Sequence, residues 1–405
     1  MGVYMDLEMK KIKKEYLRKI LATSLSNRNY STVVFHASFC LDEIKDIIEE
    51  LKDEFYLDNV IFIDFDNDKI KTFYESNPTE NEIERFVPKF SKPIGNMKLI
   101  YFRNAQTDLS DNYHSEYSAK HYSNLMDYNK ELFNRIKNLP DYDKMVTCCP
   151  NKEWAEGLLG NQKKVQELWI RISKTLLNPD EAKKEIEERK ERRNILNRIG
   201  IRNLCFYTDL GTDFRIALNS HSIWICDPSS IEGTDYFFNY PSYEIFTSPN
   251  CYSAEGKIVL SKKARFYYDA IIENAVFEFS RGRLISCKSN SETFESFLLD
   301  KSNKTNRIGE IALVSQSSPL ASSGEFYDSA LLDENTACHF ALGNSIEECI
   351  GIEKNKIKEK GARYYSYNTS ENHFDLVFGD DSISVEAETR DKKKVLLMEK
   401  GEWKI

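Results

Sequence analysis

The sequence predicts a mixed α/β and α+β protein of two domains. An N-terminal αβ domain with a mostly parallel sheet is expected over residues 1–195, and a strand-rich C-terminal domain over residues 196–405. Three observations support this division. The chain has 405 residues, a length typical of more than one domain. Apolar runs alternate with helical patterns in the first half, as in helix-covered parallel sheets. After residue 200, strand-like runs separated by Gly, Asn and Ser dominate.

The first half contains four apolar runs that predict buried strands and two periodic segments that predict helices. The strands are expected at Ser31–Phe35, Val60–Phe65, Met97–Arg103 and Met145–Cys149, and the helices at residues 7–23 and 41–54. Two more helical patterns lie within residues 151–176. The charged segment 180–194 predicts a solvated helix that links the two domains. No glycine-rich phosphate-binding motif occurs, so the sequence does not indicate a nucleotide site.

The second half is expected to be mainly strands, with the chemically interesting residues at strand ends and in loops. The runs are Leu204–Tyr207, Phe214–Leu218, Ser222–Cys226, Lys257–Leu260, Ala275–Phe279, Arg283–Cys287, Glu310–Val314, Phe374–Phe378 and Val395–Leu397.

Composition excludes several classes of protein. The net charge of −9 argues against nucleic acid or an anionic membrane as a partner. No segment has the apolar length of a signal peptide core or a membrane-spanning helix. The nine cysteines are scattered without a CxxC pair, which excludes a disulfide framework and a four-cysteine zinc site. This usage predicts a reducing, cytoplasmic environment.

Two short motifs near the C-terminus carry histidines flanked by carboxylates. In the second motif, His373 and Asp375 are two residues apart, so on a strand they share one face and can reach one site. In the first, Glu334 and His339 are five residues apart, which fits neither a helix nor a strand. A turn, or a loop that enters a helix, is therefore expected between them.

Two glutamates further upstream lie in apolar surroundings. Glu310 begins an apolar run, where a desolvated carboxylate needs a cation or a proton. The preceding Gly309 allows another backbone to approach closely. Glu244 lies between Pro241 and Pro249, which predict a rigid loop.

The charges of these residues balance two divalent cations. The four carboxylates of Glu244, Glu310, Glu334 and Asp375 supply −4, and two divalent ions supply +4. Carboxylates and imidazoles together suit zinc or cobalt, with manganese or magnesium as alternatives. Each fragment also has a structural interpretation. His339 could be a hydrogen-bonded core histidine, and Glu310 could pair with Arg307.

The C-terminal half resembles the aminopeptidase T and aminopeptidase S family of thermophilic-type metallopeptidases. The matching segments are Gly211–Asp213, Tyr240–Pro249, Ala254–Gly256, Arg307–Val314, Leu332–Gly343, His373–Asp375 and Gly401–Trp403. The resemblance implies a homodimer that hydrolyses N-terminal residues from peptides, with a metal-bridging water as nucleophile. Glu310 would bridge the ions, and Glu310 or Glu334 would transfer the proton. The implied ligands are Glu244, Glu310, Glu334, His339, His373 and Asp375.

The chain departs from the family pattern at two positions. Tyr243 replaces the first of two adjacent acids, and Ile346 replaces a tyrosine seven residues after the motif histidine. If that tyrosine stabilises the oxyanion, its loss would lower kcat about 10²–10³-fold. Tyr243 and Tyr327 are candidate substitutes.

Two other functions compete with the peptidase. His339, His373 and Asp375 could form the facial triad of a single-iron, ring-cleaving dioxygenase. The chain could also be a catalytically impaired peptide-binding protein, which the loss of the tyrosine would explain. Retention of all six ligands favours the peptidase over both.

Overall fold

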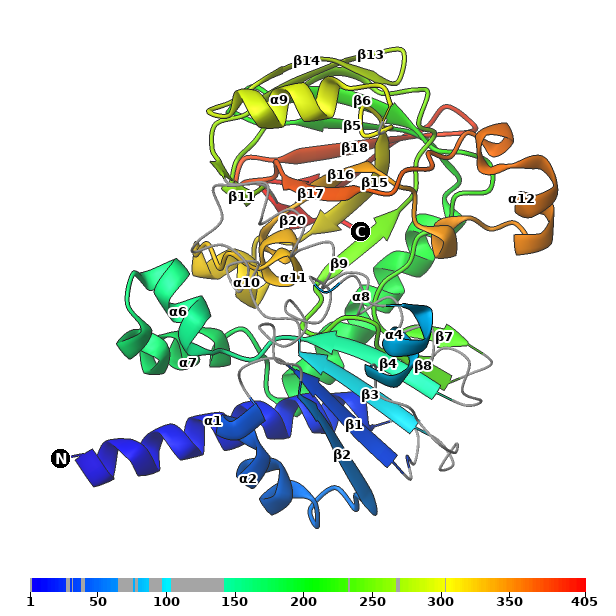
Figure 1. Ribbon diagram of the computed structural model, residues 1–405. Helices are drawn as coiled ribbons and strands as arrows, with labels where there is room; N and C mark the ends of the chain where they lie inside the picture. Colours follow the sequence, from blue (N-terminus) through cyan, green and yellow to red (C-terminus); the bar gives the residue numbers. More distant parts are fainter. Residues whose placement is uncertain are drawn as a thin grey trace. The chain divides into compact units, whose positions relative to one another are not determined.

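The computed structural model describes residues 2–26, 30, 32–37, 41–64, 76, 79–86, 97–102, 142–231, 234–266, 270–302 and 304–405. Contacts between residues divide the chain into two units (Figure 1). The first comprises Met1–Ala182 with Pro228–Pro241, and the second comprises Lys183–Asp227 with Ser242–Ile405. The change from one unit to the other falls within the helix α8 (Pro179–Arg198). A domain boundary between residues 195 and 196 stays a prediction.

The first unit contains the predicted parallel sheet. Its four strands have the order β2-β1-β3-β4, and each neighbouring pair is parallel. The strands are β1 (Thr32–Ala37), β2 (Asn59–Asp64), β3 (Met97–Phe102) and β4 (Tyr142–Thr147). The predicted strand ends Ser31, Phe65 and Arg103 lie outside the described residues. The segment 228–241 contributes β7 (Ser229–Ile231) and β8 (Thr234–Tyr236), and Asn239 forms a bridge to Val146 of β4.

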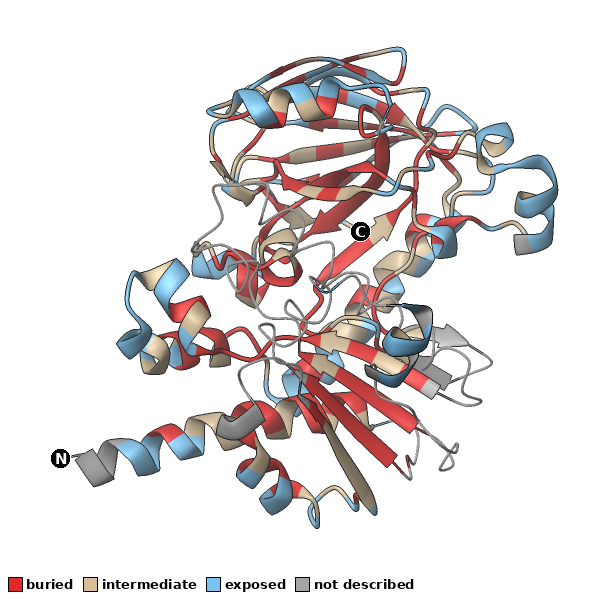
Figure 2. Cartoon of the chain, in the orientation of Figure 1, coloured by how far each residue is buried: buried red, intermediate tan, exposed pale blue. Residues whose placement is uncertain are grey.

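Helices bury their apolar residues in this unit, as the sequence periodicity predicts. Figure 2 shows β1 and β3 almost entirely buried. Helix α1 buries Tyr16, whose ring meets that of Trp169 edge to face at 5.6 Å. The helices are α1 (Gly2–Ser24), α2 (Leu41–Leu51), α4 (Glu80–Phe86), α6 (Lys152–Leu159) and α7 (Val165–Ser173), with the 3₁₀ turn η2 (Gln162–Lys164). Among the described helices of the chain, none is long and apolar enough to cross a bilayer.

One buried ion pair joins the last two strands of the parallel sheet. Lys98 and Asp143 are register partners on β3 and β4, and their charged atoms lie 2.6 Å apart. The hydroxyl of Tyr30 donates a second bond of 2.6 Å to Asp143. A buried charge without a partner is costly, so this network favours the register in which the two residues are opposite each other.

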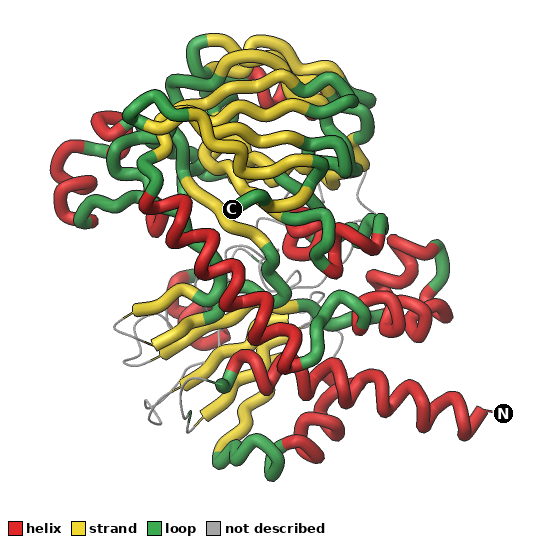
Figure 3. Tube along the Cα trace, turned by 180° about the vertical axis from the view of Figure 1, so that it is seen from behind, coloured by secondary structure: helices red, strands yellow, loops and turns green. Residues whose placement is uncertain are grey.

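The second unit contains two larger antiparallel sheets (Figure 3). Eight strands have the order β14-β13-β10-β6-β5-β18-β19-β20, and four have the order β17-β16-β15-β9. The first sheet consists of β5 (Ile201–Tyr207), β6 (Asp213–Ala217), β10 (Glu255–Val259), β13 (Val276–Ser280), β14 (Arg283–Lys288), β18 (Ser384–Thr389), β19 (Lys394–Glu399) and β20 (Glu402–Trp403). The second consists of β9 (Glu244–Thr247), β15 (Ile308–Val314), β16 (His339–Gly343) and β17 (His373–Val377).

Short elements complete the second unit. They are β11 (Ala264–Arg265), β12 (Ile271–Ile272), α9 (Glu292–Leu299), α10 (Pro319–Ser323), α11 (Ala330–Asp333), η3 (Glu334–Thr336), η4 (Glu347–Cys349), α12 (Lys354–Lys360) and η5 (Ala362–Tyr365).

A common apolar core joins the two sheets of the second unit. Phe277 of the eight-stranded sheet packs edge to face on Phe340 of the four-stranded sheet, with ring centroids 5.5 Å apart. Phe206 packs in the same way on Phe378, which directly follows β17. Along the four-stranded sheet, alternate residues enter this core. The intervening residues therefore face the opposite side of that sheet.

Two predicted segments differ from the structure. Ser222–Cys226 is not a strand, because only Ser222 and Ile225 form isolated bridges. The proline-bounded segment that was expected to be a rigid loop contains β9. In both cases, pairing with distant residues decides the conformation. The turn predicted between Glu334 and His339 is confirmed as η3, after which the chain enters the strand β16.

Gly309 allows the close backbone approach that the sequence predicts. A β-bulge lies between Ile308 and Glu310 of β15. A Cβ atom at Gly309 would lie 2.1 Å from the carbonyl oxygen of Asn344 and 2.7 Å from that of Gly343. No side chain fits at that distance, so the bulge and the position of the next residue, Glu310, depend on glycine.

We expect Gly309→Ala to destabilise the protein by about 1–3 kcal/mol, the usual cost of forcing extra atoms into a packed site. The measurement is the midpoint of urea denaturation. Gly324→Ala is the control, because Gly324 has a φ of +67° but no atom within 4 Å of an added Cβ. Its cost of about 1 kcal/mol would come from backbone conformation alone. An equal or smaller effect at Gly309 would contradict the steric argument.

Candidate metal centre

Five of the six predicted ligands lie on one face of the four-stranded sheet. In the strand register, Glu310 is opposite Ala341, and Ala341 is opposite Asp375. His373 precedes Asp375 by two residues and therefore shares its face. The same alternation places His339, two residues before Ala341, on this face. Glu244 is opposite Val314, four residues after Glu310, and so belongs to it too.

Small residues occupy the positions between the ligands. Ala341 separates Glu310 from Asp375 across the strands, and Ala312 is the register partner of His339. Gly343 is the partner of His373. The candidate ligands are therefore not separated by bulky side chains at these three positions.

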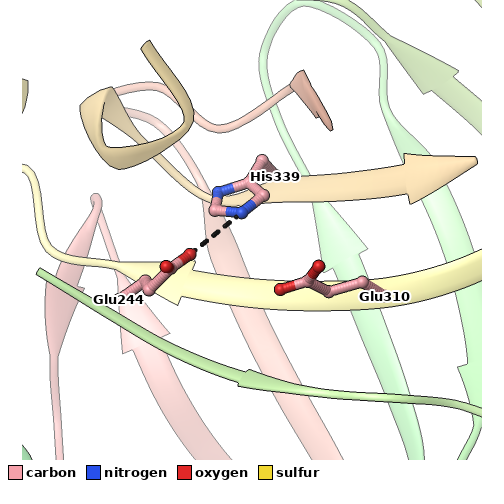
Figure 4. A group of neighbouring side chains, drawn as sticks. All are labelled: Glu244, Glu310 and His339. Atoms are coloured by element: carbon pink, nitrogen blue, oxygen red, sulfur yellow. Dashed lines mark ion pairs between the residues drawn. The ribbon is translucent and has the colours of Figure 1, made fainter. Parts of the chain in front are cut away.

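The ligand atoms form two groups that share Glu310. The first contains Glu244, Glu310 and His339, and the second contains Glu310, His373 and Asp375; in each group, the ligand atoms lie within 4.8 Å of one another. Figure 4 shows the first group, with side chains from three strands turned toward one another. His339 Nε2 lies 3.1 Å from Glu244. His373 Nε2 lies 3.0 Å from Glu310 and 3.2 Å from Asp375.

Backbone carbonyls orient both imidazole rings. The Nδ1 atom of His373 lies 2.9 Å from the carbonyl oxygen of Asn344, and that of His339 lies 3.3 Å from the carbonyl oxygen of Ala337. When Nδ1–H donates to these oxygens, Nε2 is the atom directed toward the carboxylates. A carbonyl that fixes the tautomer in this way is common behind metal-binding histidines.

Burial and the neighbouring opposite charges shift the pKa values of the groups at the site. Burial raises the pKa of Glu310, while its hydrogen bond to His373 opposes the shift. Burial lowers the pKa of His339, but the hydrogen bond to Glu244 together with the charges of Glu244, Glu310 and Asp375 outweighs burial and raises the pKa to about 9. His373 behaves likewise, because the charge of Asp375 and the bonds to Asp375 and Glu310 outweigh burial and raise its pKa. The metal-free site therefore holds protons where cations would otherwise balance the carboxylates.

This donor set fits divalent metals. Three carboxylates and two imidazoles are ligands that zinc and cobalt accept, and both groups use the same carboxylate. Binding would displace protons from the imidazoles, as metal binding generally does at histidines.

Glu334 lies in neither compact group of the described residues. It begins η3, a turn that lies against β17, and its side chain is half-buried. Its role as a ligand and as a proton acceptor stays a prediction.

Other residues that the sequence singled out have different surroundings. The guanidinium of Arg307 donates to the carbonyl oxygens of Cys251 and Gly282, both at 2.9 Å. The hydroxyl of Tyr327 donates to Ser323 at 2.9 Å. These contacts do not support a pair between Arg307 and Glu310, nor a hydroxyl of Tyr327 directed at the ligands.

One residue of the site was not assigned a role from the sequence. The amide side chain of Asn335 accepts a hydrogen bond of 2.6 Å from the backbone N–H of Tyr243, ninety-two positions away in the chain. The side chain of Asn335 is fully buried. Asn335 lies within the first histidine motif, but no local pattern could identify so distant a partner.

Several known proteins are similar to this chain. Aminopeptidase PepS of Streptococcus thermophilus is 29% identical over 64% of this chain and 65% of its own length. Aminopeptidase AmpS of Bacillus subtilis is 30% identical over 49% of this chain and 48% of its own. The aligned segments thus span less than two thirds of either relative.

The structure of wild-type AmpT from Thermus thermophilus matches 99% of this chain and 100% of its own, with a TM-score of 0.78 and 19% identity. At that identity, the match establishes the mixed α/β fold. The thermophilic metalloprotease (M29) profile matches residues 45–403. The chain therefore belongs to the thermophilic metalloprotease (M29) family.

Proposed function

We propose that the protein is an aminopeptidase with a dinuclear metal site, which removes N-terminal residues from peptides. The observation that carries this proposal is the pair of three-ligand groups joined at Glu310. A carboxylate shared between two groups suits a bridge between two ions, and two ions balance the local negative charge. The relatives PepS and AmpS are named as aminopeptidases, which supports the same reaction class.

The positions of the predicted ligands indicate which of the two ions each residue would bind. Glu244, Glu310 and His339 would hold one ion, and Glu310, His373 and Asp375 the other, with Glu334 as the sixth ligand. Divalent ions at such a site polarise a carbonyl and lower the pKa of bound water toward about 7. Glu310 or Glu334 would accept the proton of the attacking water and pass it to the leaving amine.

The grouping of ligands favours this proposal over a single-iron dioxygenase. A facial triad would need His339, His373 and Asp375 around one ion. Among the described residues, however, His339 groups with Glu244 and Glu310 rather than with His373. The triad would also leave two buried glutamates without a cation, which is unfavourable.

The catalytically impaired alternative rests on Ile346. Its side chain is half-buried and cannot donate a hydrogen bond, while its backbone exchanges hydrogen bonds with Ser248. A slow peptidase is compatible with the proposal, so catalytic activity has to be measured rather than metal binding alone. The homodimer and the cytoplasmic location also stay predictions.

The central test is Glu310→Gln in protein reconstituted with zinc, cobalt, manganese or iron. The wild type should bind two ions per chain and hydrolyse aminoacyl-nitroanilides and short peptides, but not N-acetylated peptides. The variant should lose at least about 10²-fold in kcat, because it lacks the shared carboxylate and a proton acceptor. Bound metal is counted by elemental analysis.

Glu278→Gln is the control, since Glu278 is an exposed residue of β13 in the same unit. It should retain both metal content and activity. One bound iron with oxygen consumption would refute the peptidase. Two bound ions without hydrolysis of any peptide would favour the impaired binding protein.

The two metal positions should differ in how fast they lose their ions. The side chains of His373 and Asp375 are 31% and 18% exposed, whereas His339 is 1% and Glu244 5% exposed. During dialysis against a chelator, one ion should leave well before the other. His373→Ala should remove the fast phase and keep the slow one. Loss of both ions in a single phase would contradict this expectation.

Metal-free protein should become less stable as pH rises from 6.5 to 9. The pKa of His339 is raised to about 9, so its bond to Glu244 contributes fully below the ordinary pKa of 6.5 and is lost through about 9. Melting temperatures in the presence of chelator measure this slope. His339→Gln should flatten it, and an unchanged slope in that variant would show that other groups are responsible.

A further inference from the structure

Asn335 connects two segments that carry predicted ligands. Its Oδ1 atom accepts the backbone N–H of Tyr243 at 2.6 Å, and Tyr243 directly precedes Glu244. Its Nδ2 atom donates to the carbonyl oxygen of Leu331 at 3.1 Å and lies 3.5 Å from Glu334 Oε1. One side chain thus contacts the residue before β9, the helix α11 and the first residue of η3.

The segment before Glu244 is also held from its other side. Arg189 of α8 donates to the carbonyl oxygen of Ser242 and forms an ion pair of 3.0 Å with Glu185. The single peptide group between Ser242 and Tyr243 is therefore held by Arg189 at its carbonyl oxygen and by Asn335 at its N–H. Glu244, the following residue, starts β9 with its carboxylate already directed toward His339.

We propose that Asn335 is a positioning residue of the metal centre, which holds the Glu244 and Glu334 segments at the separation that metal binding requires. This inference rests on the proposed dinuclear site. Glu334 and Glu244 are ninety positions apart and come from a turn and a strand, and pairing within the sheet constrains only Glu244. The amide of Asn335 supplies a direct link between them.

The chemistry of the amide explains why asparagine suits this position. The link needs one buried side chain that both accepts a hydrogen bond from the N–H of Tyr243 and donates one to the carbonyl oxygen of Leu331. Aspartate would keep the acceptor but lose the donor, and alanine would lose both. Because Asn335 is fully buried in the intact protein, its amide rather than water serves both backbone groups.

The test is the affinity for zinc of Asn335→Ala, measured by competition with a chromophoric chelator. We expect affinity to fall about 10–100-fold, the usual effect of losing a residue that supports metal ligands. Hydrogen exchange should show the Tyr243 amide protected in the wild type and exposed in the variant. With peptide substrate, kcat should fall more than KM changes.

Asn151→Ala is the matched control. Asn151 is equally buried, and its Oδ1 accepts a backbone N–H from Trp154 at 2.7 Å, but it caps α6 in the first unit. Its variant should lose stability while keeping the zinc affinity within about twofold. If Asn335→Ala does not fold, Asn335→Ser, which is shorter but still polar, should show a smaller fall in affinity.

Unchanged zinc affinity in the Asn335 variant would overturn the proposal. An equal fall in the Asn151 variant would also overturn it, since general destabilisation would then be the cause. A wild type that binds two zinc ions but hydrolyses no peptide would refute the proposed aminopeptidase alone. The affinity comparison would still decide the role of Asn335 in that case.

Discussion

The burial of the Glu310 carboxylate is the constraint on which the rest of the site depends. Glu310 is 4% exposed, and the opposite face of its strand packs into the core of the second unit. A carboxylate in that position needs positive charge nearby. In the metal-free chain, His373 supplies it. In the proposed enzyme, two cations would do so, and Glu310 is the residue that both ligand groups share.

The alternation of side chains along four antiparallel strands brings the candidate ligands around Glu310 together on one face of the sheet. Each strand sends one set of side chains into the apolar core and the other set to the opposite face. The ligands occupy the second set, and alanine or glycine occupies positions between them. The same sheet therefore packs one face into the core and carries the candidate ligands on the other. The turn η3 and the amide of Asn335 add a segment that the strand pairing alone would not hold.

Sequence reasoning was most successful where the signal was local. The spacing of His373 and Asp375 correctly indicated a shared strand face, and the glycine before Glu310 indicated a close backbone approach, which Asn344 makes. It failed where a distant segment decides the conformation. The residues that form β9 were predicted to be a loop because two prolines flank them. Pairing with β15 makes them a strand instead. The alternative interpretation that Glu310 pairs with Arg307 is not supported, because Arg307 binds the carbonyl oxygens of Cys251 and Gly282 instead.

By itself, the sequence indicated candidate ligands and their charge balance, and it determined the parallel sheet of the first half and the strand-rich second half. These features depend on residue type, short spacing and hydrophobic period, all of which are local properties of the sequence. Only the tertiary structure decided that His339 joins Glu244 whereas His373 joins Asp375 and Glu310. Only it revealed that Asn335 reaches Tyr243. Such contacts depend on strand register and on segments about ninety residues apart, which no local pattern specifies.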